Sequence, residues 1–98
     1  MISSKIKILD CTLRDGGYLV DWNFGKKSIY SILENLFKSG VDFIELGFLK
    51  EQVFNEDNTF FSSINDLKDL VFETQKYTLM INFGEYDIAN FSECKTKT

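Results

Sequence analysis

Three side chains of this sequence have the types and spacing needed to hold a negative charge that develops during a reaction. Arg14 and Asp15 stand next to each other, directly before two glycines, and Glu45 interrupts an apolar run further along the chain. Arg14 is the single arginine of the sequence. A guanidinium stays charged and offers its donors in a fixed geometry, which suits it to a developing oxyanion. Because a buried carboxylate needs a partner, we predict an ion pair between Arg14 and Glu45, with Glu45 facing solvent on an edge strand as the alternative.

The N-terminal residues predict a strand that ends in a loop. Apolar residues occupy both alternating faces of residues 6–15, which is typical of a strand in a parallel sheet covered on both sides. Gly16 and Gly17 then break the strand, and α/β folds present their reacting groups at such carboxyl ends. The loop that follows carries Trp22 and Phe24, which either line a functional site or cap the core.

The next segment has the pattern of an amphipathic helix over residues 26–39. Its apolar residues recur at helical spacing and form one stripe, namely Ile29, Ile32, Leu33, Leu36 and Phe37. Gly40 suits a left-handed stop at the end of this helix. Residues 41–48 follow at once as a second apolar strand. A strand, a helix and a strand in close succession predict a right-handed crossover and parallel pairing.

The second half of the chain carries weaker patterns. Residues 50–58 are polar and lack periodicity, which indicates a long loop. A second helix is expected over residues 63–74 and a third strand over residues 76–83, closed by Gly84. From about residue 92 the sequence is polar and is typical of a frayed tail. These elements predict an α/β fold of parallel βαβαβ units in a single domain.

Composition limits the class of protein. The 98 residues are enough for one domain at most, and the apolar content of 44% suffices for a core. The net charge of −4 and the absence of any Lys/Arg run argue against a nucleic-acid partner. No apolar run has the length of a signal-peptide core or a membrane span, so a cytoplasmic protein without a membrane partner is expected. Cys11 lies in the apolar strand pattern, where we expect a reduced thiol.

Two short motifs give the sequence a resemblance to a known family. Thr-Leu-Arg-Asp-Gly stands at residues 12–16, and Phe-Ile-Glu-Leu-Gly follows the predicted helix at residues 43–47. With these motifs the chain resembles the DRE-TIM metallolyases over residues 8–48. That family includes 4-hydroxy-2-oxovalerate aldolases, HMG-CoA lyase, and the isopropylmalate and homocitrate synthases. The resemblance implies that residues 1–98 are the N-terminal part of a TIM (β/α)₈ barrel with about three βα units, as a truncated form or a fragment of a longer gene product.

The same resemblance implies roles for individual residues. Asp15 would ligate a divalent metal such as Mg²⁺, Mn²⁺ or Zn²⁺, Arg14 would stabilise the enolate oxygen of a 2-oxo acid such as pyruvate, and Glu45 would hold Arg14 in place. Making or breaking a carbon–carbon bond next to a carbonyl develops charge on that oxygen, which a metal and a guanidinium stabilise well. Tyr18 stands where the aldolases of the family carry a histidine base and the synthases a glutamine. It would either relay a proton or line the mouth of the site.

The family completes its metal site with a His-x-His pair on a late strand, whereas this sequence contains no histidine. We therefore expect the 98 residues alone to hold metal weakly and to be inactive, and their open sheet edges to favour self-association. Two other interpretations stay open. One is a small flavodoxin-like α/β binding or signalling module without catalysis, and the other is a purely structural ion-pair network of Arg14, Asp15 and Glu45.

Overall fold

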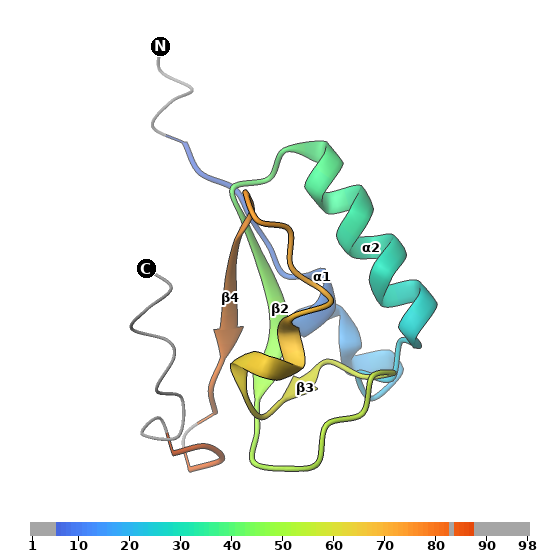
Figure 1. Ribbon diagram of the computed structural model, residues 1–98, viewed down its shortest axis with the longest axis vertical. Coiled ribbons are helices and arrows are strands. Elements are labelled where there is room, and N and C mark those ends of the chain that lie inside the picture. The colour runs from blue at the N-terminus through green and yellow to red at the C-terminus, as the bar shows by residue number, and fades with distance from the viewer. Residues whose placement is uncertain (1–5, 83, 88–98) are drawn as a thin grey trace.

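The computed structural model describes residues 6–82 and 84–87, which form a small α/β domain (Figure 1). Its elements follow in the order β1 (Leu9–Asp10), α1 (Thr12–Asp15), the 3₁₀ helix η2 (Gly16–Leu19), α2 (Lys26–Ser39), β2 (Phe43–Leu49), β3 (Phe60–Phe61), the 3₁₀ helix η3 (Ile64–Leu67) and β4 (Lys76–Met80). The predicted α/β class and parallel pairing are confirmed. The polar tail predicted from about residue 92 lies outside the described residues.

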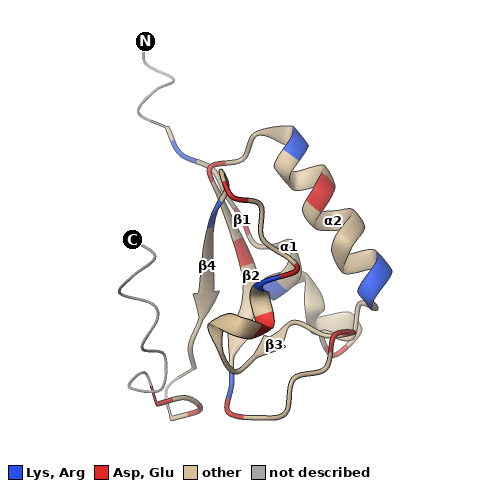
Figure 2. Ribbon diagram, viewed as in Figure 1, with Lys and Arg blue, Asp and Glu red and all other residues tan. Residues whose placement is uncertain are grey.

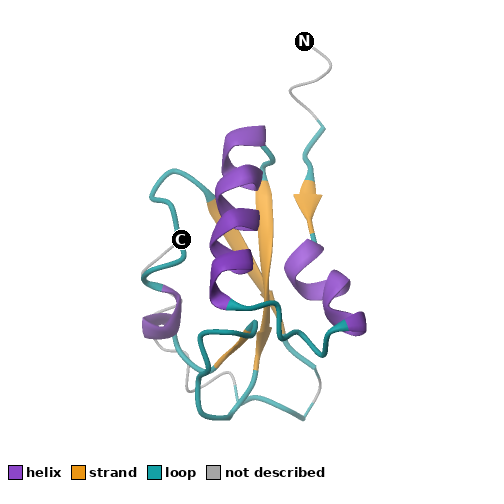
Figure 3. Ribbon diagram, turned by 90° about the vertical axis from the view of Figure 1, so that its right-hand side faces the viewer, coloured by secondary structure: helices purple, strands orange, loops and turns teal. Residues whose placement is uncertain are grey.

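Strand β2 is the centre of the sheet, and every described strand pairs with it in parallel. Phe43 pairs with Leu9 of β1 on one edge and with β4 on the other. Further along, Phe48 pairs with Phe60 of β3 and again with β4. β1 and β3 therefore share one edge of β2, and β4 occupies the opposite edge. After β1 the chain leaves this edge of the sheet and forms α1. Figure 3 shows the short helix directly after the end of β1.

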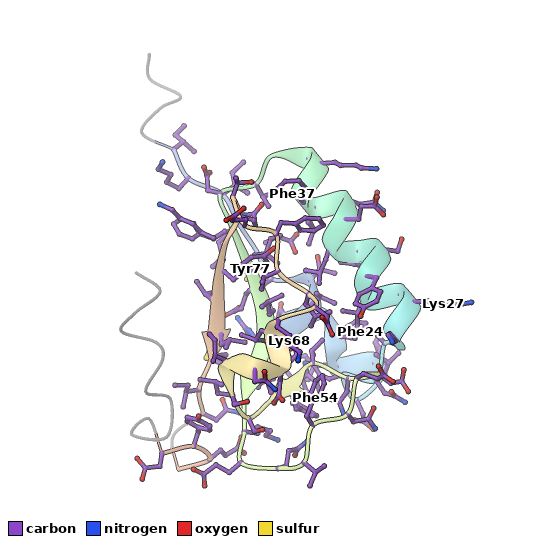
Figure 4. All side chains as sticks on the ribbon, viewed as in Figure 1. Phe24, Lys27, Phe37, Phe54, Lys68 and Tyr77 are labelled. Carbon is purple, nitrogen blue, oxygen red and sulfur yellow. The ribbon has the colours of Figure 1, made fainter. Side chains whose placement is uncertain are left out.

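Helix α2 covers one face of the sheet (Figures 1 and 3). It has the bounds that the sequence predicts, and Gly40 ends it in the left-handed region with a φ of 83°. The buried cluster beneath it joins helix and strand residues, among them Ile29, Leu33, Ile44 and Leu46. Figure 4 shows Lys27 extending away from the domain on the outer side of α2, while Phe37 points back toward the sheet. The amphipathic pattern of this helix therefore places its apolar stripe on the core.

The segment between β3 and β4 covers the same face of the sheet as α2. Its apolar residues pack against the cluster beneath α2, namely Ile64, Leu67, Leu70 and Phe72. Phe72 also stacks on Phe37 of α2, with the ring centroids 4.2 Å apart. The connection from β1 to β2 and the connection that leads to β4 thus lie on one side of the sheet. Because side chains alternate along a strand, Glu45, between Ile44 and Leu46, faces the opposite side.

The strand predicted over residues 6–15 is much shorter in the structure. β1 holds two residues, and Thr12 begins helix α1. The cause is local, since the Asp10 carboxylate accepts hydrogen bonds from the Thr12 backbone N–H at 2.9 Å and from the Thr12 hydroxyl at 3.1 Å. An aspartate that binds the backbone two residues on turns the chain and does not extend it. Arg14 consequently lies on a helical turn beyond the end of β1.

The helix predicted over residues 63–74 is also wrong. The structure has only the single 3₁₀ turn η3 there, capped at its start by the Asp66 carboxylate, which accepts a hydrogen bond from the Ser63 N–H at 3.2 Å. Further along, the Phe72 N–H donates to the Tyr77 hydroxyl at 2.6 Å and leads the chain into β4. These side-chain contacts compete with helical hydrogen bonds over the same residues.

Strand boundaries shift by a few residues. The strands predicted over residues 41–48 and 76–83 run over Phe43–Leu49 and Lys76–Met80, and Phe83 lies outside the described residues. The loop predicted over residues 50–58 is confirmed. β3 follows this loop and has no counterpart among the predictions, because two residues are too few to show an alternating pattern.

Candidate functional site

The predicted ion pair between Arg14 and Glu45 is confirmed. Arg14 Nε donates a hydrogen bond to Glu45 Oε1 at 2.9 Å, which joins helix α1 to strand β2. The Glu45 side chain is 9% exposed and that of Arg14 is 21% exposed, so the solvent-facing alternative for Glu45 is wrong. The hydrogen bond to Glu45 raises the pKa of the Arg14 guanidinium above its ordinary value. Figure 2 shows the charged positions of α1 and β2 near one another in the middle of the domain, whereas those of α2 are spaced along that helix.

Asp15 lies at the outer end of the same charged group. Its Oδ1 is 3.6 Å from Arg14 Nη1, and its side chain is 69% exposed. Arg14 is therefore flanked by one buried carboxylate, which fixes Nε, and by one exposed carboxylate near Nη1. The three charged residues singled out from the sequence are brought together by the fold.

The described residues do not fit a tightly bound divalent metal. No group of three His, Cys, Asp or Glu side chains lies close enough together in this part of the chain to hold one. The Asp10 carboxylate caps the turn into α1, and Asp15 offers a single exposed carboxylate next to a cation. Divalent metals in proteins take several oxygen or nitrogen ligands, so Asp15 alone is an incomplete ligand set.

Tyr18 lies in η2 and is 64% exposed, and its ring packs edge-on against Trp22 with the centroids 4.7 Å apart. This position places the phenol at the surface, next to the indole that donates to the Arg14 backbone carbonyl. Both roles that the sequence leaves open for Tyr18, proton relay or lining of the mouth, stay compatible with this placement.

Trp22 has a structural role at the site that the sequence did not assign. Its indole N–H donates a hydrogen bond to the backbone carbonyl of Arg14. Its ring lies against Gly17, where a Cβ would come within 2.1 Å of the indole, and packs on the rings of Phe48 and Phe60. Of the two interpretations for the aromatic loop, packing therefore holds for Trp22, and Phe24 packs against the core cluster as well.

Two threonines near the charged group were not identified from the sequence. Thr59 is 0% exposed, and its hydroxyl donates to the backbone carbonyl of Leu13 at 2.9 Å. Thr78 of β4 is in register with Glu45, and its buried hydroxyl oxygen has no hydrogen-bond partner among the described residues. Neither threonine carries a sequence signal, because its significance depends on a partner more than thirty positions away.

Cys11 adds a thiol to the same neighbourhood. It is free and half-buried, in line with the predicted reduced state. Burial is the main cause that raises the pKa of the Cys11 thiol above its ordinary value, and the nearby Glu45 carboxylate raises it further, while Arg14 acts in the opposite direction.

Protein-family models, curated proteins and solved structures offer no match to this chain. Within the described residues no helix has the length and apolar character to cross a membrane. The geometry around Arg14 is therefore the basis for a functional proposal.

The arrangement around Arg14 is suited to holding an anion. The Nε donor is used by Glu45, Asp15 Oδ1 lies 3.6 Å from Nη1, and the Cys11 thiol also interacts with the guanidinium. Among the described residues, Nη1 and Nη2 make no hydrogen bond to a carboxylate. A guanidinium anchored by one edge keeps its orientation and offers its other edge to a ligand. The partial exposure of the Arg14 side chain leaves it within reach of solvent.

Proposed function

We propose that this chain is the N-terminal part of a divalent-metal-dependent aldolase or related carbon–carbon lyase that acts on 2-oxo acids through an enolate. The observation that carries the proposal is the 2.9 Å hydrogen bond between Arg14 Nε and Glu45 Oε1. It joins the residue pair that the Leu-Arg-Asp-Gly and Glu-x-Gly motifs single out, at the carboxyl end of β1. The Arg14 cation is thus fixed at the carboxyl end of parallel strands, the position at which α/β enzymes place their reacting groups.

In this proposal Arg14 stabilises the oxygen on which charge develops. In the cleavage of a 4-hydroxy-2-oxo acid, a base takes the proton of the 4-hydroxyl group, and the aldehyde C=O forms as the bond between the third and fourth carbons breaks. The electron pair of that bond stays on the pyruvate fragment, as an enolate. A preorganised cation aimed at that oxygen lowers the barrier because its orientation is set before the reaction. Glu45 sets this orientation through its hydrogen bond to Nε, which also raises the pKa of the Arg14 guanidinium, a group that is charged in any case.

The metal enters the proposal only through the resemblance. Asp15 would contribute one ligand, and the described donors do not complete the site, so further ligands would come from elsewhere. The 98 residues are accordingly proposed to be inactive by themselves.

The sheet supports the barrel interpretation more than a flavodoxin-like module. A (β/α)₈ barrel uses strands in sequential order with all connections on its outer side. In this chain β2 lies between β1 and β4, and α2 and η3 cover the same face. A flavodoxin-like sheet instead places its first strand between the second and the third.

A binding experiment tests the anion site in the chain itself. Oxalate resembles the planar enolate of pyruvate, and the single arginine gives one Nε–Hε signal in a ¹⁵N spectrum. Oxalate should shift this signal and the backbone amide signals of α1. In Arg14→Lys, where only the amide signals remain to be followed, oxalate should cause no shift, because lysine keeps the charge but lacks the planar set of donors. Lys38→Ala, which removes an exposed lysine of α2, is the matched control and should bind as the parent does. Equal shifts with sulfate and oxalate would reject an enolate site.

An activity experiment tests the reaction. The coding region past Thr98 is sequenced, and the extended protein is assayed for pyruvate release from a 4-hydroxy-2-oxo acid with Mg²⁺, Mn²⁺ or Zn²⁺. We expect a later strand with a His-x-His pair and metal-dependent release that Arg14→Lys abolishes. A metal-loaded extended protein without any release would rule out the aldolase and leave the non-catalytic alternatives.

A further inference from the structure

We propose that Trp22 and Thr59 are positioning residues that clamp helix α1 from two sides and so fix the guanidinium of Arg14. Their effect on ligand binding rests on the function proposed above, whereas the clamp itself is a property of the chain. Both residues donate side-chain hydrogen bonds to successive backbone carbonyls of α1, those of Leu13 and Arg14.

Helix α1 needs support from outside because it is one turn long. It spans four residues, and its start is held by the Asp10 carboxylate at the Thr12 N–H, whereas the side chain of the N-cap residue Cys11 makes no capping hydrogen bond. A single turn has few intrahelical hydrogen bonds to offset its loss of chain entropy. Thr59 Oγ1 holds the Leu13 carbonyl at 2.9 Å, and the indole N–H of Trp22 holds the Arg14 carbonyl. Two neighbouring peptide groups are thereby fixed by donors from distant parts of the chain.

The Thr59 side of the clamp explains the glycine of the Glu-x-Gly motif. Gly47 has a φ of 149°, and a Cβ there would lie 2.1 Å from the Thr59 carbonyl oxygen. The Phe48 N–H also donates to that carbonyl at 3.0 Å. Glu45 therefore binds the guanidinium, and Gly47, two positions on, leaves room for the residue that holds the backbone of α1.

The Trp22 side of the clamp is held under backbone strain. Asp21 and Trp22 have φ values of 52° and 58°, in the left-handed region that residues other than glycine avoid. Such strain persists where the surrounding contacts hold it, often at functional sites. Here the contacts are the hydrogen bond to Arg14, the close approach to Gly17 and the ring of Phe48 at 5.4 Å.

The consequence of the clamp is a preorganised cation. With the backbone on both sides of the Arg14 Cα held, the side chain can meet Glu45 without reordering of α1 when a ligand arrives. Preorganised donors avoid that cost during binding and reaction. Loss of either clamp residue should loosen Arg14 and leave the distant parts of the fold unchanged.

The test measures hydrogen exchange at the single arginine Nε–H of the 98-residue chain, without ligand. Thr59→Val removes the hydroxyl at nearly constant shape, Thr59→Ser restores it, and Trp22→Phe removes the indole N–H. Tyr77→Phe is the matched control, because it removes a hydroxyl that accepts the Phe72 N–H at 2.6 Å. Folding of each variant is checked from the amide signals of α2.

We expect exchange about 3- to 10-fold faster in Thr59→Val and Trp22→Phe, the factor for one lost hydrogen bond, and parent-like exchange in Thr59→Ser and Tyr77→Phe. Equal exchange in Thr59→Val and Tyr77→Phe would overturn the clamp. If Trp22→Phe fails to fold, the two Thr59 variants decide. Oxalate affinity should fall by the same factor, and a parent chain that binds no oxalate would refute the proposed function while the exchange rates still decide the clamp.

Discussion

Arg14 and Glu45 are 31 positions apart in the sequence and share a hydrogen bond of 2.9 Å between Nε and Oε1. Helix α2 lies between them along the chain, and parallel pairing of β1 with β2 brings their ends together. The carboxylate is nearly buried, so the hydrogen bond from the guanidinium compensates for the water that it has lost. The energetic coupling between the two side chains can therefore be measured.

Removal of either partner should destabilise the fold. Glu45→Gln and Arg14→Met should each cost about 1–3 kcal/mol in the free energy of unfolding, because each leaves the other group with a weaker partner. The double variant should cost less than the sum by at least about 1 kcal/mol. Urea unfolding of the four proteins gives this coupling energy. The exposed pair Glu34 and Lys38 is the control, with an expected coupling below about 0.5 kcal/mol. Equal coupling in both pairs would contradict the buried role.

Substitution of Gly47 should be far more harmful than substitution of Gly40. Both have positive φ, at 149° and 83°, but a Cβ on Gly40 meets nothing within 4 Å, whereas one on Gly47 meets the Thr59 backbone. Gly40→Ala should cost about 1 kcal/mol for the left-handed backbone alone. Gly47→Ala should cost more than about 2 kcal/mol, since the strain and the clash add. Thermal unfolding of both variants measures the difference in stability. Equal losses of stability would mean that the backbone at Thr59, directly before β3, moves aside at little cost.

The two buried threonine hydroxyls should respond oppositely to the same change. Thr78→Val removes an oxygen without a partner and should stabilise the chain by up to about 1 kcal/mol. Thr59→Val leaves the Leu13 carbonyl without its donor and should destabilise by about 1–3 kcal/mol. Denaturant unfolding at one pH compares the two variants directly. A loss of stability in Thr78→Val would show that its hydroxyl has a partner in solution.

The Cys11 thiol should resist ionisation in the folded chain. Burial and the Glu45 carboxylate raise its pKa relative to the unfolded state, so the folded state holds its proton at a pH where the unfolded state releases it. The corresponding stability is fully present below the unfolded pKa and is lost as the pH rises through the folded pKa. In a Cys94→Ser background, alkylation at mildly alkaline pH should be slower in the folded chain than in urea. Glu45→Gln should speed it, because the thiolate is the nucleophile. Equal alkylation rates in the parent and in Glu45→Gln would show that Glu45 does not raise the pKa of the Cys11 thiol.

The edge at β1 should drive self-association. Leu9 of β1 is 48% exposed, and Ile6 and Ile8, which directly precede this strand, are 65% and 56% exposed. Apolar edge strands with free backbone groups pair with other chains, and a lysine at such a position prevents it. Sedimentation should therefore find oligomers in the parent and a shift to monomer in Ile8→Lys, with Lys27→Ala on the outer face of α2 as control. A monomeric parent at high concentration would contradict this expectation.

The sequence by itself determined helix α2, predicted at about residues 26–39, the strand that carries Glu45, and the pairing of Glu45 with Arg14. These features follow from helical periodicity, from the glycine at the helix end, and from the desolvation cost of a carboxylate in an apolar run. Helical periodicity and the helix end depend on residues close together in the sequence, and the desolvation cost depends on the burial of one residue. The residue types alone therefore reveal them.

Only the tertiary structure decided where the chain leaves β1 and what holds α1. The turn at Asp10 depends on its carboxylate reaching the Thr12 N–H, which competes with strand hydrogen bonds that the alternating pattern predicts equally well. The hydrogen bond from Thr59 to Leu13 spans 46 positions, and the fit of Trp22 on Gly17 depends on a left-handed turn. The Thr59 hydrogen bond leaves no periodic trace in the sequence, because it forms only after the sheet has brought distant segments together. The contacts at Asp10 and Trp22 are local, but the residue types alone do not decide between them and a continued strand or an open loop.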